Sequence, residues 1–216
     1  MIRIILADDH AVVRDGIRAI VEKRAQDISV IGEAADGREV LRLAKETPAD
    51  IYILDVAMPE LNGLETAERL LRMNRKNRII LLSMYDNRAF VEQAINTGVK
   101  SYILKESAAD DILHAIREVH EGRHYLSPKV SKYADIGVHG RKKPGIAKFD
   151  GRRLTSRERE VLQLISEGCC NKEIAVKLNR SVNTIHVHRN NLMQKLDLHS
   201  QAELVRYALK EGLSQL

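Results

Sequence analysis

Five polar residues, each at or just after the end of a short apolar run, have the types that phosphoryl chemistry requires. They are Asp8, Asp9, Asp55, Ser83 and Lys105. Carboxylates crowded together repel one another, so such a cluster needs a cation, and oxygen ligands are those that Mg²⁺ prefers. One carboxylate can then act as a nucleophile on a phosphoryl group while Mg²⁺ neutralises the developing charge. A lysine adds positive charge for the phosphate, and a serine adds a hydrogen-bond donor.

The apolar runs that end in these residues predict strands, and amphipathic stretches between them predict helices. The expected strands are residues 2–7, 29–34, 51–55, 79–84 and 101–105, and the expected helices lie near 12–25, 37–47, 63–74, 87–97 and 107–121. Regular alternation favours right-handed crossovers and a parallel sheet covered on both faces. The sequence therefore predicts a flavodoxin-like, doubly wound α/β domain with a five-stranded parallel sheet and functional residues at the carboxyl ends of the strands.

The motifs around these residues, taken in order, resemble those of two-component receiver domains. They are Leu-Ala-Asp-Asp-His at 6–10, Leu-Asp-Val-Ala-Met-Pro at 54–59, Asn-Gly at 62–63, Leu-Ser-Met-Tyr at 82–85 and Tyr-Ile-Leu-Lys at 102–105. The resemblance covers about residues 1–122. It implies that Asp55 accepts a phosphoryl group from a sensor histidine kinase. It also implies that Asp9, Asp55 and the backbone carbonyl of Ala57 bind Mg²⁺, with Asp8 acting through water.

Three further residues receive roles from the same resemblance. Ser83 and Lys105 would contact the phosphoryl group. Tyr102 would be an aromatic switch that swings inward when Ser83 moves toward the phosphate. One departure is Glu106, which stands where many receivers carry Pro, so the sequence leaves open whether the peptide bond after Lys105 is cis.

Simpler interpretations exist for each feature taken alone. An Asp-Asp pair before a helix is commonly a cap, Lys105 could be a solvated lysine, and Tyr102 could be a packed residue at an edge. The rival chemistry of a haloacid-dehalogenase-type phosphatase needs a second Asp two residues after the nucleophile, where this chain has Ala57. A Gly-rich phosphate loop, a Gly-x-Ser-x-Gly elbow and a His-Glu-x-x-His motif are absent from the sequence. We therefore expect a phosphorylation-controlled regulator and not an enzyme.

Charge divides the chain into two modules and a connecting segment. Residues 1–125 hold 18 Lys and Arg against 21 Asp and Glu, whereas residues 151–216 hold 11 against 7. The segment 126–150 holds 6 against 2 and contains two of the four prolines. An acidic first module and a basic second one indicate that the second faces a polyanion. We expect a receiver domain at 1–122, a linker at 123–150 and a second domain at 151–216.

The composition favours a cytoplasmic location. Charged residues make up 30% of the chain, and no apolar run approaches the ~20 residues that span a bilayer. Two acids directly follow the first apolar run, unlike a secretory signal. The only cysteines, Cys169 and Cys170, are adjacent, and neighbouring residues rarely form a disulfide. A reducing cytoplasm fits this pair; small buried thiols are the simpler interpretation and a redox sensor the alternative.

Residues 154–212 carry helical patterns throughout and predict a small four-helix bundle. Capping residues mark the starts of its helices: Thr155 or Ser156, Asn171, Ser181, and Ser200 or Gln201. The middle pair, expected at 172–178 and about 182–196, can form a helix-turn-helix. In the longer helix Ile185, Leu192 and Leu196 recur near helical spacing and should face the core.

The motifs of this bundle resemble the LuxR-type helix-turn-helix over about residues 151–214. They are Leu-Thr-Ser-Arg-Glu-Arg-Glu-Val-Leu at 154–162, Gly168, Asn-Lys-Glu-Ile-Ala at 171–175, Ser-Val-Asn-Thr-Ile-His-Val-His-Arg at 181–189 and Lys-Leu at 195–196. With a receiver ahead of it, the chain resembles the NarL/FixJ family of response regulators nearly end to end. That resemblance implies a transcription factor that binds double-stranded DNA at promoter half-sites, as a homodimer when phosphorylated or on DNA.

A recognition helix places its N-terminal residues against base edges in the major groove. By resemblance the candidates for base contacts are His186, Val187 and Asn190. Val187 could meet a thymine methyl and Asn190 could pair with adenine, unless Val187 belongs to the core. His186 stands where Lys is commoner, which leaves the base preference open. Candidates for phosphate contacts, which position the protein without specifying sequence, are Lys172, Thr184, His188, Arg189 and Lys195.

Two other functions remain open from the sequence. The helical domain could dock a protein under phosphate control instead of DNA. The chain could also bind DNA independently of phosphate, with a vestigial receiver. The intact set of five polar residues argues against the second alternative, and the pattern of the recognition helix argues against the first.

Overall fold

The computed structural model describes residues 1–86, 88–133 and 154–213. The chain separates into two compact units, Met1–Arg141 and Lys142–Leu216, which we describe one at a time. Most of the segment predicted as a linker, residues 134–150, lies outside the described residues. Each helix in the described ranges is too short or too polar to cross a membrane.

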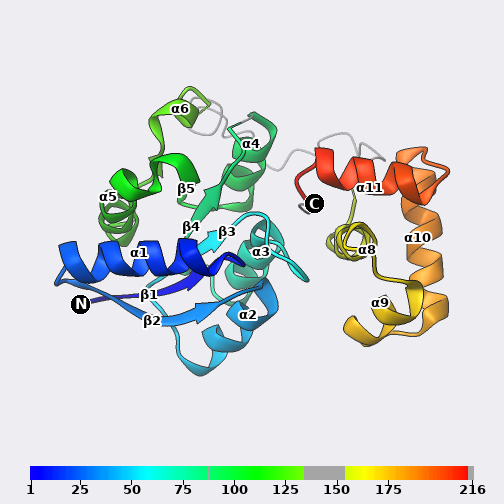
Figure 1. Ribbon diagram of the computed structural model, residues 1–216, viewed down its shortest axis with the longest axis horizontal. Coiled ribbons are helices and arrows are strands. Elements are labelled where there is room, and N and C mark those ends of the chain that lie inside the picture. The colour runs from blue at the N-terminus through cyan, green and yellow to red at the C-terminus, as the bar shows by residue number, and fades with distance from the viewer. Residues whose placement is uncertain (87, 134–153, 214–216) are drawn as a thin grey trace. The chain divides into compact units, whose positions relative to one another are not determined.

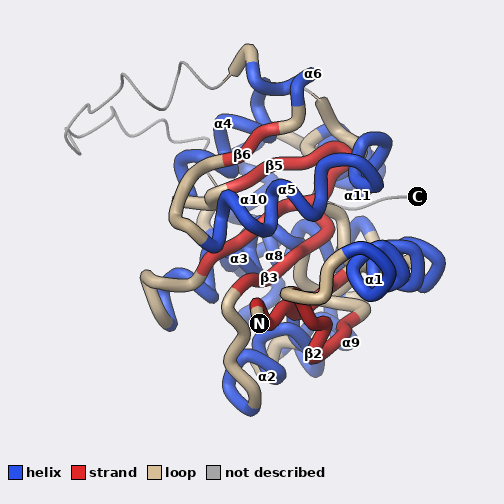
Figure 2. The backbone as a smooth tube through the Cα atoms, turned by 90° about the vertical axis from the view of Figure 1, so that its left-hand side faces the viewer, coloured by secondary structure: helices blue, strands red, loops and turns tan. Residues whose placement is uncertain are grey.

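A six-stranded sheet forms the centre of the N-terminal unit, with strand order β2-β1-β3-β4-β5-β6. Every neighbouring pair is parallel, and Figure 2 shows the strands of this sheet in red. The strands are β1 Ile2–Ala7, β2 Ile28–Ala34, β3 Ile51–Asp55, β4 Arg78–Ser83, β5 Ser101–Leu104 and β6 Tyr125–Leu126. The doubly wound parallel architecture predicted from the sequence is confirmed. The sheet has six strands, however, one more than the five that were predicted. A two-residue strand carries no alternation or apolar run by which a sequence pattern could reveal it.

Helices cover both faces of this sheet (Figure 1). Those described are α1 Ala11–Arg24, α2 Gly37–Glu46, α3 Gly63–Met73, α4 Arg88–Thr97 and α5 Ala108–His120. One core lies between the sheet and α1 with α5, and the other lies between the sheet and α2, α3 and α4. Neighbouring residues such as Ile4 and Ile5 belong to opposite cores because successive strand side chains point to opposite faces. Burial on both faces explains the continuous apolar runs, and each buried aliphatic side chain contributes about 1.5–3 kcal/mol.

The first part of the predicted linker packs on the N-terminal unit. Strand β6 pairs with β5 at Ser101 and Tyr102. The short helix α6, Pro128–Ser131, follows it, and Val130 is fully buried in the core beside α4. Residues 125–131 are therefore folded onto the sheet before the chain leaves the described range.

The described part of the C-terminal unit, residues 154–213, contains four helices, as predicted. They are α8 Ser156–Ser166, α9 Asn171–Lys177, α10 Val182–Leu196 and α11 Gln201–Lys210. Thr155 and Glu158 close a capping box at the start of α8, and the Ser181 side chain caps α10. Ile185 and Leu192 are buried and Leu196 is partly buried, so these three residues face the core as their spacing predicts.

Candidate functional site

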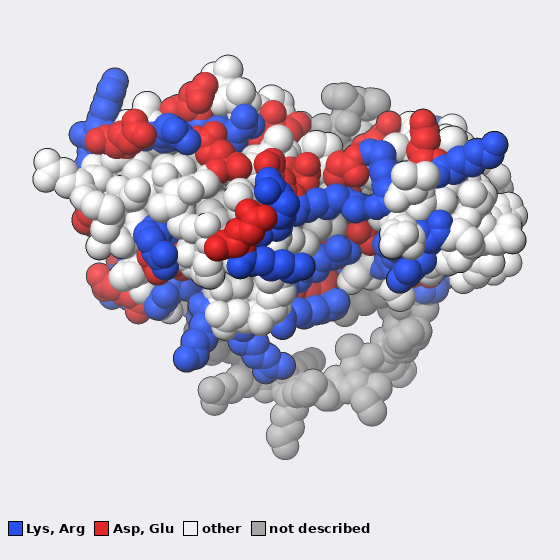
Figure 3. Space-filling model, turned by 90° about the horizontal axis from the view of Figure 1, so that it is seen from below, with Lys and Arg blue, Asp and Glu red and all other residues white. Residues whose placement is uncertain are grey.

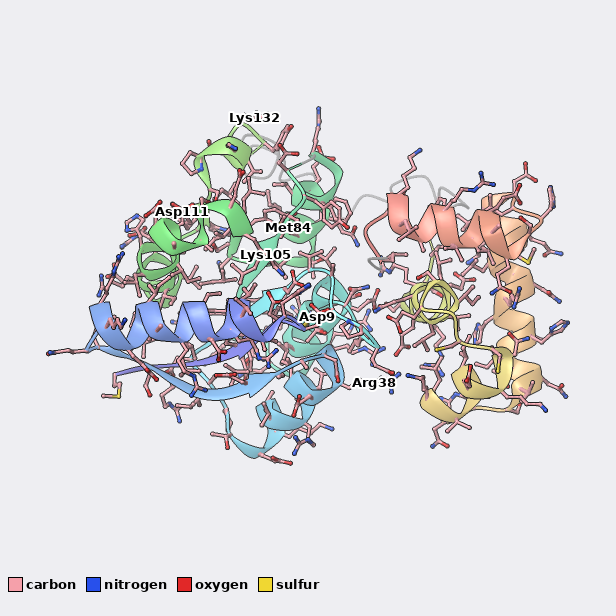
Figure 4. All side chains as sticks on the ribbon, in the orientation of Figure 1. Asp9, Arg38, Met84, Lys105, Asp111 and Lys132 are labelled. Carbon is pink, nitrogen blue, oxygen red and sulfur yellow. The ribbon has the colours of Figure 1, made fainter. Side chains whose placement is uncertain are left out.

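The carboxyl ends of the parallel strands gather the polar residues that the sequence singles out. Asp8 directly follows β1, Asp55 ends β3, Ser83 ends β4 and Lys105 directly follows β5. Figure 4 shows Asp9 and Lys105 at this end of the sheet. Because the strands run in the same direction, their ends lie at one edge, where ligands of open α/β sheets bind.

Lys105 joins two of the carboxylates directly. Its Nζ lies 2.7 Å from Asp8 Oδ2 and 3.0 Å from Asp55 Oδ1, and its side chain is only 10% exposed. Burial by itself would lower the pKa of Lys105, but the Asp55 and Asp8 carboxylates outweigh it and raise that pKa. Lys105 is therefore a buried ion-pair partner and not a solvated lysine.

Asp55 is held in a state that resists ionisation. Burial, followed by the charge of Asp8, raises its pKa to about 6, although Lys105 and the backbone amide of Ala57 act in the opposite direction. One oxygen of Asp55, Oδ2, is buried and has no hydrogen-bond partner among the described residues. A buried acceptor without a partner costs free energy, and a cation or an electrophile at this oxygen would remove that cost.

The donor set fits a hard divalent cation. Asp8, Asp9 and His10 each offer a ligand atom, and these atoms lie within 4.8 Å of one another. Asp8 is fully buried and Asp9 is exposed, so the acid pair spans the depth of the site. Three carboxylates against the single charge of Lys105 leave the pocket with excess negative charge. Carboxylate oxygens with room for water match what Mg²⁺ prefers.

His10 and Arg14 contact the acid pair, and sequence reasoning missed both. His10 Nδ1 lies 2.9 Å from Asp9 Oδ1 and 3.3 Å from Asp8 Oδ1. Arg14 Nη1 donates to the backbone carbonyl of Asp8 at 2.5 Å, while its Nε lies 3.3 Å from Glu33 Oε2. The available signal was position: His10 directly follows the acid pair, and Arg14 follows it by one helical turn.

A chain of hydrogen bonds runs from Ser83 to Tyr102. Ser83 is fully buried and its Oγ accepts from the backbone amide of Tyr85 at 2.9 Å. The Tyr102 hydroxyl donates to the backbone carbonyl of Tyr85 at 2.8 Å, and the Tyr85 ring stacks on Phe90 with 4.7 Å between centroids. Tyr102 is only 1% exposed, and burial raises its pKa. Its ring is thus packed inside the unit.

The backbone around the site is fixed by close packing. A Cβ on Gly63 would lie 2.1 Å from the carbonyl oxygen of Asp55, so only glycine lets α3 begin this close to β3. The Gly63 amide donates to Val56 at 3.0 Å. The peptide bond after Lys105 is trans, as are all peptide bonds in the described part of the chain.

The second set of predicted residues lies on α9 and α10. Lys172, His186, Val187 and Asn190 are exposed, and Val187 at 56% exposure is not a core residue. Thr184, His188, Arg189 and Lys195 are half-buried. The exposed residues leave side chains free to meet a groove of DNA, whereas the half-buried ones already have protein neighbours.

Two of the predicted phosphate contacts are bonded within the C-terminal unit. Lys195 Nζ lies 2.8 Å from Oε2 of Glu158, which is nearly buried in the capping box of α8. Arg189 donates to Gln201 at 3.1 Å and to Asn171 at 3.4 Å. These bonds tie the long helix α10 to the starts of α8, α9 and α11.

Away from the acid cluster, the N-terminal unit also carries ion pairs between exposed side chains. On the face drawn in Figure 3, Lys and Arg side chains lie among Asp and Glu side chains over that unit. Exposed pairs such as Arg42 with Glu39 and Arg117 with Asp27 contribute about 0–1 kcal/mol each. The cluster of Asp8, Asp55 and Lys105 is set apart by its burial and by the raised pKa values of Asp55 and Lys105, which are features of functional sites.

Each of the two units matches a known protein family. Residues 4–117 match the family model of the response regulator receiver domain, and residues 152–208 match that of the bacterial regulatory proteins of the luxR family. The chain is 37% identical to the oxygen regulatory protein NreC of Staphylococcus carnosus. The aligned 214 residues cover 98% of this chain and 98% of that one. It is 34% identical over 212 residues to the transcriptional regulatory protein YhcZ of Bacillus subtilis, covering 98% of this chain and 97% of that one.

Solved structures extend the likeness to three dimensions. A structure of the RcsB response regulator of Salmonella typhimurium is 28% identical, covers 97% of both chains and has a TM-score of 0.67. RcsB of Salmonella enterica serovar Typhimurium, bound to a promoter in the presence of the phosphomimetic beryllofluoride, is 28% identical, covers 96% of this chain and 98% of that chain, and has a TM-score of 0.62. The chain therefore belongs to the NarL/FixJ family of two-component response regulators, transcription factors that join a phosphorylation-controlled receiver domain to a LuxR-type helix-turn-helix domain.

Proposed function

We propose that Asp55 accepts a phosphoryl group from a sensor histidine kinase, in a Mg²⁺-dependent reaction that controls DNA binding by the C-terminal unit. The observation that carries this proposal is the unpartnered, buried Oδ2 of Asp55 beside the ammonium of Lys105. In the transfer, the P–N bond of a phosphohistidine breaks as an O–P bond to Asp55 forms. The product is an acyl phosphate on the buried carboxyl.

Mg²⁺ would be held by Asp9, Asp55 and the backbone carbonyl of Ala57, with Asp8 acting through water. The carboxylates of Asp8 and Asp9, whose ligand atoms lie within 4.8 Å of each other, support that assignment. When bound, Mg²⁺ neutralises charge that develops on the transferred phosphoryl oxygens. Arg14 holds the Asp8 carbonyl, and His10 lies against the Asp9 carboxylate, so both residues would keep the acid pair in place.

Lys105 and Ser83 would bind the phosphoryl oxygens. Lys105 pairs with Asp8 and Asp55 before the reaction, and a phosphoryl group on Asp55 would draw its ammonium to new oxygens. Ser83 would donate its hydroxyl to the phosphoryl group and move toward it. That movement would break the bond from the Tyr85 amide, which is the first link of the chain that reaches Tyr102.

Tyr102 would act as the aromatic switch at the end of that chain of hydrogen bonds. Its hydroxyl holds the Tyr85 carbonyl, so the position of residues 83–85 and that of the Tyr102 ring depend on each other. Tyr102 lies on β5 beside α4 and α5, whose surface would be remodelled. The phosphorylated state must bind its partner better than the resting state, and a tenfold shift corresponds to ~1.4 kcal/mol.

The C-terminal unit would read double-stranded DNA through α10, with His186, Val187 and Asn190 at base edges. Their exposure supports this assignment. The residues that would contact phosphates are Lys172, Thr184, His188, Arg189 and Lys195. RcsB has been observed as dimers bound to DNA, which supports a homodimer on two half-sites here. The working units would be a receiver at 1–122, a linker at 123–150 and a DNA-binding domain at 151–216, in the cytoplasm.

Sedimentation of the full chain tests this function. With Mg²⁺ and beryllofluoride, a stable mimic of the phosphoryl group, the wild-type chain should shift from monomer to dimer, and Asp55→Asn should not. Selection from a random DNA pool under the same conditions should enrich a sequence with two half-sites. If the shift occurs but no DNA is enriched, the C-terminal unit docks a protein instead. If DNA is enriched equally with and without beryllofluoride, the receiver does not control binding.

A further inference from the structure

A second polar cluster lies on α5, away from the acid pocket that Asp8, Asp9, Asp55 and Lys105 form. Its centre is Asp111, labelled in Figure 4. Asp111 Oδ2 accepts hydrogen bonds from Ser107 and Ser127, both at 2.7 Å, and Oδ1 accepts one from the Tyr125 hydroxyl at 2.8 Å. Burial would raise the pKa of Asp111, but the three hydroxyls outweigh it and lower that pKa. The cluster is thus a set of charge-assisted hydrogen bonds, the stronger kind.

The donors to Asp111 come from two separate segments. Ser107 ends the 3-10 turn at Lys105–Ser107, directly after β5. Tyr125 and Ser127 belong to β6 and its end, the part of the chain that continues toward the C-terminal unit. Burial and Asp111 raise the pKa of Tyr125 to about 12, so its hydroxyl stays protonated and remains a donor. Asp111 therefore fastens the turn after β5 to the segment of residues 125–131.

This cluster reaches the strand end that carries Lys105. β6 pairs with β5 only at Ser101 and Tyr102, so the ladder stops before Leu104. The backbone amide of Leu104 donates instead to Ser127 Oγ at 3.2 Å. Ser127 is only 1% exposed and, in turn, donates to Asp111. A continuous path of hydrogen bonds thus joins Asp111 to the backbone amide of Leu104, the residue before Lys105.

Residues 125–131 are also held to the sheet by the pairing of β6 with β5, by a 3.1 Å hydrogen bond from the Ser127 amide to the Tyr102 carbonyl, and by the buried Val130. An open cavity of about 380 Å³ lies between residues 104–110 and 127–129, so side-chain packing does not fill the space beside the cluster. Lys129 pairs with Glu106 at 2.6 Å across it, but both side chains are more than half exposed, and such pairs contribute little. The link from residues 125–131 to the turn after β5 therefore consists of the hydrogen bonds to Asp111 and Ser127 and the 3.0 Å contact between Ser107 Oγ and Ser127 Oγ.

We propose that Asp111 and Ser127 are positioning residues for Lys105, which make residues 125–131 part of the apparatus that binds the phosphoryl group. The inference rests on the proposed role of Lys105. Because the two ends of such a link affect each other equally, binding of a phosphoryl group at Lys105 also stabilises the docked form of residues 125–131. Those residues lead into the C-terminal unit, so the link carries the state of the acid pocket toward it.

The acid pocket offers a readout that separates positioning from general stability. Mg²⁺ meets the carboxylates, whereas beryllofluoride also needs the ammonium of Lys105. Loss of the link should therefore weaken binding of beryllofluoride and leave binding of Mg²⁺ unweakened. A variant that merely loosens the fold would weaken both.

The test uses the full chain, with calorimetric titration for Mg²⁺ and fluorine NMR for beryllofluoride at saturating Mg²⁺. Ser127→Ala removes both the acceptor for Leu104 and the donor to Asp111, and should weaken beryllofluoride binding about five- to tenfold. Asp111→Asn removes the charge and should give a smaller loss, and Tyr125→Phe the smallest. Ser131→Ala is the matched control, because its hydroxyl donates only to the nearby carbonyl of Pro128.

The outcomes separate cleanly. A selective loss for beryllofluoride in Ser127→Ala and Asp111→Asn, with Ser131→Ala like the wild type, supports the proposal. Affinities within twofold of the wild type in both variants, or equal losses for Mg²⁺ and beryllofluoride, overturn it. If Ser127→Ala does not fold, Asp111→Asn decides alone. A wild-type chain that fails to bind beryllofluoride at all refutes the proposed function instead.

Discussion

The side chains of the acid pocket and those on the surface of α10 differ in burial, and therefore in what determines their function. In the pocket the buried carboxylates of Asp8 and Asp55 each lie within 3.0 Å of the Lys105 ammonium. The pKa values of Asp55 and Lys105 are both raised. On α10 His186, Val187 and Asn190 are exposed. Buried charges must be matched to one another, so the chemistry of the pocket is fixed by the fold. Exposed side chains are fixed only by their partner, so the readout of DNA can change without a change in the fold.

The largest expected effect is at the phosphoacceptor. Asp55→Asn removes the carboxylate proposed as the nucleophile and should abolish phosphorylation by a small-molecule phosphodonor with Mg²⁺, as measured by the intact mass of the chain. Asp50→Asn is the matched control, since Asp50 pairs with Arg3 at the other end of the sheet. A variant Asp55→Asn that still gains a phosphoryl group at full yield would move the acceptor to another residue.

The next effect concerns stability in the absence of metal. Lys105→Met removes the ammonium that pairs with both Asp8 and Asp55, and should destabilise the metal-free chain by about 3 kcal/mol, since an unpaired buried charge is costly. Mg²⁺ should recover much of that loss in urea unfolding followed by circular dichroism. Lys172→Met, at an exposed position on α9, should change the free energy of unfolding by less than about 0.5 kcal/mol. Equal effects of the two variants would remove the contrast between pocket and surface.

The pH dependence of Mg²⁺ binding sharpens the same contrast. The pKa of Asp55 is raised to about 6, and Mg²⁺ binds only the ionised carboxylate, so protons compete below that pH. Affinity should be nearly constant from pH 8 to 7 and fall roughly tenfold for each unit below about 6. Calorimetric titration across this range measures it. A decline that begins only near pH 4, the ordinary range of Asp, would mean that the pocket does not perturb Asp55.

The smallest effects are expected on the DNA surface, where two lysines can be compared. If each contacts one phosphate, Lys172→Ala and Lys195→Ala should both reduce the slope of log affinity against log salt by about 1. Only Lys195→Ala should also lower the free energy of unfolding, because it leaves Glu158 without its cation. Fluorescence anisotropy with labelled promoter DNA gives the slopes. An unchanged slope in Lys195→Ala would assign that lysine to the fold alone.

The sequence predicted the fold where the signals are local. The bounds of α10 match the prediction because the Ser181 side chain caps its start and Asp197 ends it in the left-handed region, at a φ of 55°. The apolar runs also predicted that strands end at or just before Asp8, Asp55, Ser83 and Lys105, as they do in the structure. Such features depend on neighbouring residues, and the chain displays them in order.

The sequence could not predict contacts between distant residues. Lys195 and Glu158 are 37 positions apart, and no periodicity pairs them. β6 is too short to leave a pattern, and Ser127 directly after it donates to Asp111, 16 positions earlier in the chain. His10 and Arg14 lie near the acid pair in the sequence, but their contacts with it depend on how the chain turns from β1 into α1.

The central claim is that the state of Asp55 sets the DNA affinity of the C-terminal unit. The most direct measurement is the affinity of the full chain for its selected DNA with Mg²⁺, with and without beryllofluoride, for the wild type and for Asp55→Asn. We predict at least about a tenfold gain with beryllofluoride in the wild type, equivalent to ~1.4 kcal/mol, and no gain in Asp55→Asn. Equal affinities in all four measurements would contradict the account.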